Sequence, residues 1–567
     1  MKKVLASILA VLTCISSSAL CGCFDHSPGT SEDNDPTKAH LYVNTYSGGF
    51  GSQWLEAAAS RFESQYAEHS FIEGTSGVKV HINAHKSAGS AILEAMDVQT
   101  DDVFFNEQGF YYSAATSGKL LDISDIVKEN LSEKYGEDKT ILSKYTSTQR
   151  EFFTVDGKVY GIPHYSGYFG ISYDIDLFES KNFYYADEPT TSTGLISNKT
   201  QKRSKGPDGI YNTEDDGLPT TYDELFALCD VMVKRGVTPF CYGGQVRGDY
   251  LNSFLSALYI DAEGYEQGML NFDFGGTPAT RLVKSLETDD SGKILSVEYE
   301  DATAIDNSNG YMLMKQAGRA YALSFLNRLT SNIDYYDQNT AKETTTHTAA
   351  QLAYLQSSLE GRPIAFLLDG IYWENEAQTS GAYDQLVGAY GEKASSQNRN
   401  FGWMPLPKPE KDWPAGANLY DYLYTFAFIN ANIAENKIDL AKSFLQFCYT
   451  DKSLVEFTVL TNTPKALSYE IEKSALDKMT TFGRSIISLK NKETTKVVYP
   501  YSLNDMYLNN QSGLNLQDSW RALVDGKSKT YAVDAFKKDA FNAKDYFTGL
   551  SAFRTQKEWQ ANYGKWF

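Results

Sequence analysis

Residues 41–51, Leu-Tyr-Val-Asn-Thr-Tyr-Ser-Gly-Gly-Phe-Gly, decide the fold class. The first six have the β-branched and aromatic character of a strand, and the glycines that follow form a tight turn. Ser52 is placed to cap a helix that runs to about residue 66. Its apolar residues recur every three or four positions, on one face: Leu55, Ala59, Phe62 and Tyr66. The stretch therefore predicts a strand, a turn and an amphipathic helix.

The same alternation continues along the chain. Residues 78–82, 103–105 and 169–173 are expected to be strands, and residues 91–96 are expected to be helical. A β-α-β-α-β order favours a mostly parallel sheet with helices on its faces, and such sheets bind ligands at the carboxyl ends of their strands. Further helices are expected at about 221–234, 349–359 and 435–449, and long polar loops at about 181–220 and 288–310.

The first residues are typical of an export signal. Lys2 and Lys3 precede an apolar run over residues 4–12, which is too short to span a bilayer, and Cys21-Gly22-Cys23 follows. We expect a signal peptide over residues 1–22, lipidation of Cys23 and a disordered tether over 23–38; a cleaved signal peptide without lipidation is the alternative. The mature chain is then expected at the cell surface, on the outer side of the cytoplasmic membrane.

The composition of the chain limits the classes of partner that it can bind. The 567 residues contain 52 basic and 72 acidic side chains, a net charge of −20, which argues against nucleic acid and anionic lipid as partners. The chain contains 39 tyrosines, whose rings combine an apolar face with a polar group and suit a polar solute with flat faces. Beyond the signal, Cys229, Cys241 and Cys448 are expected to be buried thiols, although a Cys229–Cys241 bridge is an alternative.

Six segments, taken in order, carry a family resemblance. They are residues 42–62; 102–105 with 118–123; 157–163 with 171–178; 361–373; 404–407; and 441–447 with Asp451, Phe457, Thr458 and Pro464. Together they resemble the extracellular solute-binding proteins of ABC importers, in the carbohydrate-binding group that includes maltose-binding protein. The resemblance covers most of residues 40–465 and departs from the family in length, with insertions near 181–220 and 265–345.

The resemblance implies a periplasmic-binding-protein-like α/β fold, with two lobes, a hinge of crossing segments and a ligand cleft between the lobes. The expected crossings lie near residues 164–170, 408–424 and 458–465. The lobes implied are an N-terminal lobe of residues 39–166 plus 410–460 and a C-terminal lobe of residues 167–409 plus 461–567. A monomer that hands its solute to ABC permease subunits is expected, attached to the membrane only through its lipid anchor.

Candidate ligand contacts follow from the strand-end rule. Polar and glycine residues come directly after the first three strands: Tyr46, Ser47, Gly49, Phe50, Lys86, Asn106, Glu107 and Gln108. Amide and carboxylate groups suit the paired hydroxyls of a sugar. Trp54 stacks on the ligand or joins the core, and Tyr165 and Tyr168 lie at the first crossing.

Aromatic side chains elsewhere are candidates for stacking on a sugar ring. Trp373 is the first of them, because the family often places a stacking aromatic in this segment; Glu374 beside it is a polar candidate. Trp403, Tyr420 and Tyr422 border the second crossing, and Trp520 lies in a segment that loosely resembles another stacking position.

One loop is rich in oxygen ligands. Asp208, Asn212, Glu214, Asp215 and Asp216 offer the carboxylates and carbonyls that Ca²⁺ prefers, although their spacing is not that of an EF-hand. A structural calcium site and a solvated acidic turn are the alternatives, and no other cofactor is expected.

The sequence thus predicts a non-enzymatic protein that captures an oligosaccharide by lobe closure. Two alternatives remain: an exported glycosidase, which needs two carboxylates across the bond that it cleaves, and the same fold binding a peptide or polyamine. Stacking aromatics in the cleft favour a sugar, whereas a buried acidic cluster favours a polyamine.

Overall fold

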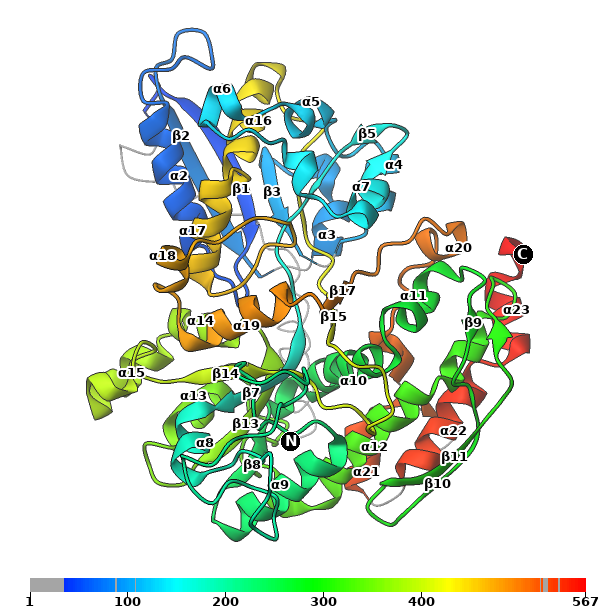
Figure 1. The fold of residues 1–567 in the computed structure, drawn as a ribbon. Helices are drawn as coiled ribbons and strands as arrows, with labels where there is room; N and C mark the ends of the chain where they lie inside the picture. Colours follow the sequence, from blue (N-terminus) through cyan, green and yellow to red (C-terminus); the bar gives the residue numbers. More distant parts are fainter. Residues whose placement is uncertain (1–34, 87–88, 108, 521, 524–528, 539–540) are drawn as a thin grey trace, which may run out of the picture.

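The structure is a computed structural model that describes residues 35–567 except 87–88, 108, 521, 524–528 and 539–540. The chain forms two α/β lobes, each built around its own sheet (Figure 1). The predicted two-lobe fold class is therefore confirmed. Within the described residues, no helix combines the length and the apolar character that a bilayer crossing needs. The predicted signal peptide and Cys23 lie outside this part of the chain.

The N-terminal lobe contains a five-stranded sheet in the order β2-β1-β3-β16-β6. Its strands are β1 (Ala39–Tyr46), β2 (Val78–His85), β3 (Val103–Asn106), β6 (Ile162–Pro163) and β16 (Phe426–Ile429). β1 pairs in parallel with β2 and β3, so the carboxyl ends of these three strands meet at one edge. β16 returns from far along the chain and pairs antiparallel with β3.

Helices α2 (Gln53–Gln65), α16 (Ile438–Cys448) and α17 (Asp451–Thr461) belong to the N-terminal lobe. The apolar face predicted for α2 is buried: Leu55 and Phe62 have no exposed surface, and the Phe62 ring meets Phe444 of α16 edge to face at 5.2 Å. Burial of this stripe, at about 1.5–3 kcal/mol per large apolar side chain, holds α2 in place and so fixes the turn before it.

The C-terminal lobe contains a four-stranded sheet in the order β14-β7-β13-β8. Its strands are β7 (Phe169–Asp174), β8 (Thr238–Cys241), β13 (Ile364–Gly370) and β14 (Phe401–Met404). Every residue of β7 and β13 is buried, which explains their continuous apolar sequence. The helices of this lobe that bear on the site are α10 (Arg247–Glu263), α13 (His347–Ser357), α14 (Trp373–Thr379) and α19 (Thr481–Asn491).

The insertion at 265–345 is more ordered than its sequence predicts. It contains α11 (Tyr265–Asp273), a hairpin of β10 (Val283–Thr288) and β11 (Ile294–Tyr299), and α12 (Ala317–Ser331). The long loop expected at 288–310 is thus partly strand. The C-terminal helices α21 (Ala532–Lys537) and α22 (Ala543–Phe553) lie beside α12, so the end of the chain joins the insertion in one helical layer (Figure 1).

Three crossing segments connect the lobes and hydrogen-bond to one another. His164 N–H donates to the Thr425 carbonyl at 3.2 Å, Ser166 N–H donates to Pro464 O at 3.1 Å, and Tyr422 N–H donates to Gly167 O at 3.2 Å. These bonds join residues 164–167, 422–425 and 464–466 into a hinge. Few backbone bonds need to change when such a hinge bends, because each crossing is a single extended segment.

The second crossing begins later than predicted. β15 (Asn418–Tyr420) pairs with β17 (Lys496–Val498), and the Asn418 backbone N–H donates to Asp261 of α10 at 2.8 Å. Residues 418–420 therefore belong to the C-terminal lobe, and the chain enters the N-terminal lobe only after the hinge at 422–425. The expected N-terminal lobe segment that starts at residue 410 starts too early.

Candidate functional site

A cleft with a volume of about 410 Å³ lies where the two lobes face each other. Both lobes contribute to it: Tyr46, Gly48, Gly49, Phe50, Lys86 and Glu107 come from the N-terminal lobe, Asp249, Tyr250, Ser253, His347, Tyr372 and Glu376 come from the C-terminal lobe, and Tyr422 and Leu423 come from the second crossing. Its volume is within the range of small-molecule sites.

The N-terminal wall follows from the parallel sheet. Tyr46 ends β1, Lys86 follows β2 and Glu107 follows β3, and the strand register places these three ends side by side. Gly49 and Phe50 come from the glycine-rich turn after β1. Tyr46, Gly49, Phe50, Lys86 and Glu107 are thus brought together as the strand-end rule predicted.

Glu107 is the most perturbed carboxyl group of this wall. It is buried, and the Tyr165 hydroxyl donates a hydrogen bond to it. Burial, reinforced by the charge of Glu376 from the other lobe, raises the pKa of Glu107 to about 7 despite that bond. Near neutral pH the group therefore interconverts between an acceptor-only carboxylate and an acid that can donate to a hydroxyl.

The C-terminal wall carries tyrosines and two carboxylates, Asp249 and Glu376. The Tyr372 and Tyr422 hydroxyls are hydrogen-bonded at 2.9 Å, which holds the two rings in place. Glu376 pairs with His347 Nε2 at 3.1 Å and accepts from Gln351 Nε2 at 2.8 Å. The hydrogen bond that His347 donates to Glu376 raises the pKa of His347, so the Glu376 carboxylate favours the protonated imidazole.

The lobes touch across this cleft. Asn375 Nδ2 donates to the Gly49 carbonyl at 2.8 Å, and the Phe50 ring meets the Tyr372 ring edge to face at 5.6 Å. A Cβ on Gly49 would lie 2.5 Å from Cδ2 of Tyr372, so only glycine allows this approach. The structure is therefore a closed arrangement of the lobes.

Trp373, the first stacking candidate, does not face the cleft. Its side chain has no exposed surface, and its ring packs edge to face on Phe401 and Phe482 at 5.3 Å and on Tyr354 at 5.7 Å. At the start of α14 successive residues point in different directions, so Tyr372 faces the cleft while Trp373 enters the core. The predicted stacking role is thus corrected to a core role.

Other candidates are also core residues, and none of them lines the cleft. Trp54 packs on Phe105 at 5.0 Å and on His164 at 5.1 Å, at the base of the hinge. The indole nitrogen of Trp520 donates to Ser256 at 2.7 Å, deep in the C-terminal lobe. The remaining members of this group are buried too: Asn106, Tyr165, Tyr168, Glu374, Trp403 and Tyr420. Ser47 is partly exposed but bonds to His85 O, and Gln108 lies outside the described residues.

Several cleft residues were missed from the sequence. Asp249, Tyr250 and Ser253 begin α10, the helix after β8, and the strand-end rule could have pointed to them had β8 been recognised. Tyr372 directly precedes Trp373 within the segment that was singled out, and Glu376 follows Trp373 by three residues. His347 carries no signal of its own, because only the fold places the start of α13 beside Glu376.

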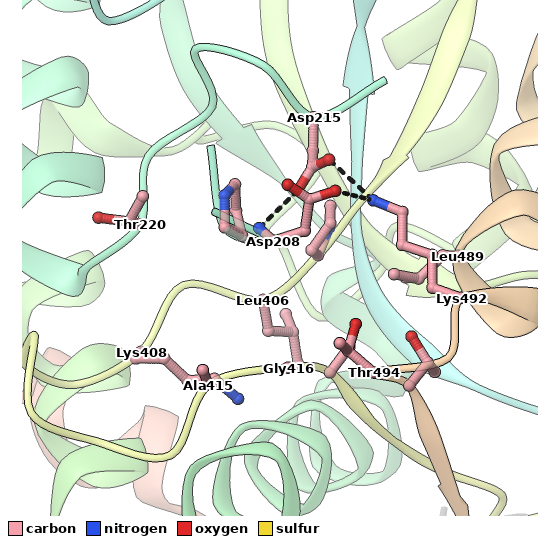
Figure 2. A pocket seen from close by; sticks show the side chains of 14 residues that line it. Asp208, Asp215, Thr220, Leu406, Lys408, Ala415, Gly416, Leu489, Lys492 and Thr494 are labelled. Carbon is pink, nitrogen blue, oxygen red and sulfur yellow. Dashed lines mark hydrogen bonds and ion pairs between the residues drawn. The ribbon is translucent and has the colours of Figure 1, made fainter. Parts of the chain in front are cut away.

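Two carboxylates of the acidic loop at 206–217 face a lysine side chain. Figure 2 shows Asp208 and Asp215 turned toward Lys492, whose Nζ lies 2.7 Å and 2.8 Å from their carboxylate oxygens. The ammonium group therefore takes the place where a cation would bind. Across the described ranges, no group of three or more His, Cys, Asp or Glu side chains could hold a metal ion.

Lys492→Met is expected to lower the free energy of unfolding by about 1–3 kcal/mol, because the largely buried carboxylates of Asp208 and Asp215 then lose the ammonium group that pairs with both. Urea unfolding with and without added Ca²⁺ checks this. Because Lys492 pairs with both carboxylates, Ca²⁺ is expected to leave the stability of the unchanged chain and of Lys492→Met the same. Stabilisation of the unchanged chain by Ca²⁺ would contradict it.

The three cysteines of the described chain, Cys229, Cys241 and Cys448, are buried free thiols. Burial raises the pKa of each, so none is suited to nucleophilic chemistry. The alternative Cys229–Cys241 bridge is absent from the structure.

Comparison with known proteins gives separate support for the fold class. No family model and no curated protein sequence matches the chain. Solved structures do match: the solute-binding protein RafE in complex with raffinose has a TM-score of 0.51 at 14% identity, covering 91% of this chain and 98% of its own. The chain has the solute-binding protein fold.

Two further solved structures are similar to the chain over nearly its whole length. A chitin oligosaccharide binding protein has a TM-score of 0.52 at 15% identity, covering 92% of this chain and 99% of its own. A structure from work on xylan utilization by the thermophilic bacterium Caldanaerobius polysaccharolyticus has a TM-score of 0.51 at 13% identity, covering 91% and 99%. These likenesses extend over nearly the whole of each chain and concern the two-lobe fold.

Proposed function

We propose that the chain captures an oligosaccharide in the cleft by lobe closure and delivers it, unaltered, to the permease of an ABC importer. The observation that carries this proposal is that aromatic rings from both lobes line one cleft: Tyr46 and Phe50 face it from one side, and Tyr250 and Tyr372 from the other. Such rings offer flat faces to the C–H side of a pyranose, and the surrounding carboxylates accept from its hydroxyls.

The similar structures support a sugar as the ligand of the cleft. Raffinose, a chitin oligosaccharide and xylan utilization appear in the descriptions of three of them. We further propose that export and a lipid anchor on Cys23 hold the chain outside the cytoplasmic membrane, since the apolar run at 4–12 and the cysteine pattern are those of a lipoprotein signal.

Calorimetric titration tests the ligand class. The screen uses raffinose, chito-oligosaccharides and xylo-oligosaccharides, with spermidine as a cationic solute. We expect saturable binding of at least one sugar, and no binding of spermidine, because Lys86 and the His347–Glu376 pair offset the acidic charge of the cleft. Binding of spermidine alone would favour the polyamine alternative.

Tyr46→Ala and Tyr250→Ala are each expected to weaken binding of that sugar roughly tenfold, about 1.4 kcal/mol, because each removes one ring from the cleft. Tyr299→Ala is the matched control, since Tyr299 is exposed on β11, away from the cleft. Equal affinities in all three variants would place the sugar elsewhere.

A second candidate function, glycoside hydrolysis, rests on one observation. Glu107 and Glu376 face the same cleft from opposite lobes, and their environments differ: Glu107 has a raised pKa, whereas Glu376 is paired with His347. Prolonged incubation of the protein with the bound oligosaccharide separates the two candidates. Recovery of the intact sugar supports capture, whereas cleavage that is lost in Glu107→Gln supports an enzyme.

A further inference from the structure

A second cavity, of about 560 Å³, lies between the lobes and shares no lining residue with the cleft. We call it the lysine groove. One wall is the chain at 146–148, where α7 (Ser147–Phe153) begins in the N-terminal lobe. The opposite wall comes from α11, the end of α19 and the chain around β17, which lie below α7 in Figure 1. Residues 467–469, which follow the third crossing, complete it.

The charge of the lysine groove is opposite to that of the chain. Lys490 and Lys496 line it, and none of the described residues that line it is an Asp or Glu. The chain as a whole has a net charge of −20. A cavity lined by positive charge raises the local concentration of anions, even on a protein whose net charge is negative. The lining therefore selects a ligand that carries negative charge.

Lys490 has no partner for its charge. No hydrogen bond or ion pair to its ammonium group is found within the described part of the chain. By contrast, Lys408 lies 2.7 Å from Asp261, and Lys492 lies 2.7 Å from Asp208. Burial lowers the pKa of Lys490 to about 8, although the charge of Asp421 opposes the shift. An anionic ligand would supply the missing partner.

The rest of the lining suits a sugar ring. Tyr265, Tyr469 and Tyr499 contribute aromatic rings, and Ser147 and Asn491 contribute an exposed hydroxyl and amide. A bare inorganic anion would use the lysines and leave the three rings without a contact. A pyranose that carries a carboxylate uses both.

We propose that the lysine groove is a second binding site, for an acidic saccharide, with a uronate carboxylate on Lys490 and the sugar ring against the tyrosines. The site does not depend on what the cleft binds, because the two cavities have no residue in common.

Calorimetric titration of the full chain with digalacturonate tests the proposal, with sodium sulfate as the bare anion. Lys490→Met is expected to weaken digalacturonate binding at least tenfold, and Lys490→Arg to retain it. The melting temperature of Lys490→Met should equal or exceed that of the unchanged chain, because a partly buried charge without an ion-pair partner is removed. Lys393→Met, which removes an exposed lysine that lines neither cavity, is the matched control and should bind as the unchanged chain does. Lys86→Met, which removes the lysine of the cleft, shows whether the acidic sugar lies there instead.

Three results would overturn the proposal. The first is no binding of digalacturonate, or equal binding by Lys490→Met. The second is loss of binding in Lys86→Met instead, which would place the acidic sugar in the cleft. The third is an affinity for sulfate equal to that for digalacturonate, which would show that the lysine groove binds anions without any contribution from the tyrosine rings.

Discussion

Trp373→Ala lowers the free energy of unfolding by about 3–5 kcal/mol and leaves sugar affinity unchanged in the protein that remains folded. The reason is geometric: the indole is fully buried among Tyr354, Phe401 and Phe482, so truncation removes its contacts and leaves a cavity in the C-terminal lobe. Urea unfolding followed by circular dichroism measures the loss, and calorimetry measures the affinity.

Trp566→Ala is the control for this substitution. Trp566 is only partly buried, next to the end of the chain, and its loss should change stability by less than about 1 kcal/mol. If Trp373→Ala keeps its stability and loses the sugar instead, the indole faces the ligand, as the sequence alone predicted, and the core assignment is refuted.

Gly49→Ala is expected to weaken sugar binding by roughly 10- to 100-fold without lowering the melting temperature of the ligand-free protein. The added Cβ would lie 2.5–2.8 Å from the Tyr372 side chain, and overpacking of this kind costs about 1–3 kcal/mol. Gly49 and Tyr372 belong to different lobes, so the clash exists only when the lobes are closed. The substitution therefore raises the energy of the closed state alone, and the ligand must offset that rise.

Gly388→Ala serves as the matched control. Gly388 lies on the exposed side of α15 (Ala382–Tyr390), and a Cβ there has no neighbour within 4 Å. Its affinity for the sugar should equal that of the unchanged chain, and its helix should gain slightly in stability. Equal affinity in Gly49→Ala would mean that binding does not need this closed contact.

The sequence predicts the N-terminal wall of the site well because the physics there is local. A strand, a glycine turn and a helix occur in order, and parallel pairing brings the ends of β1, β2 and β3 to one edge. Tyr46, Gly49, Phe50, Lys86 and Glu107 follow from that rule alone.

The C-terminal wall depends on contacts between residues far apart in the chain, which periodicity does not encode. Tyr372 and Trp373 are neighbours, yet one lines the cleft and the other fills the core, and the direction depends on how α14 packs. The β10–β11 hairpin was missed because half of its strand residues are polar and only half of the others are buried. The acidic loop suggested calcium because the sequence does not show that Lys492 folds against it.

Small-angle X-ray scattering of the full chain, without sugar and at saturation with the oligosaccharide found by calorimetry, tests lobe closure most directly. The radius of gyration is expected to fall on binding, and Gly49→Ala is expected to show a smaller fall at the same sugar concentration. An unchanged radius of gyration at saturation would show that the two lobes hold the sugar without moving, and would contradict capture by closure.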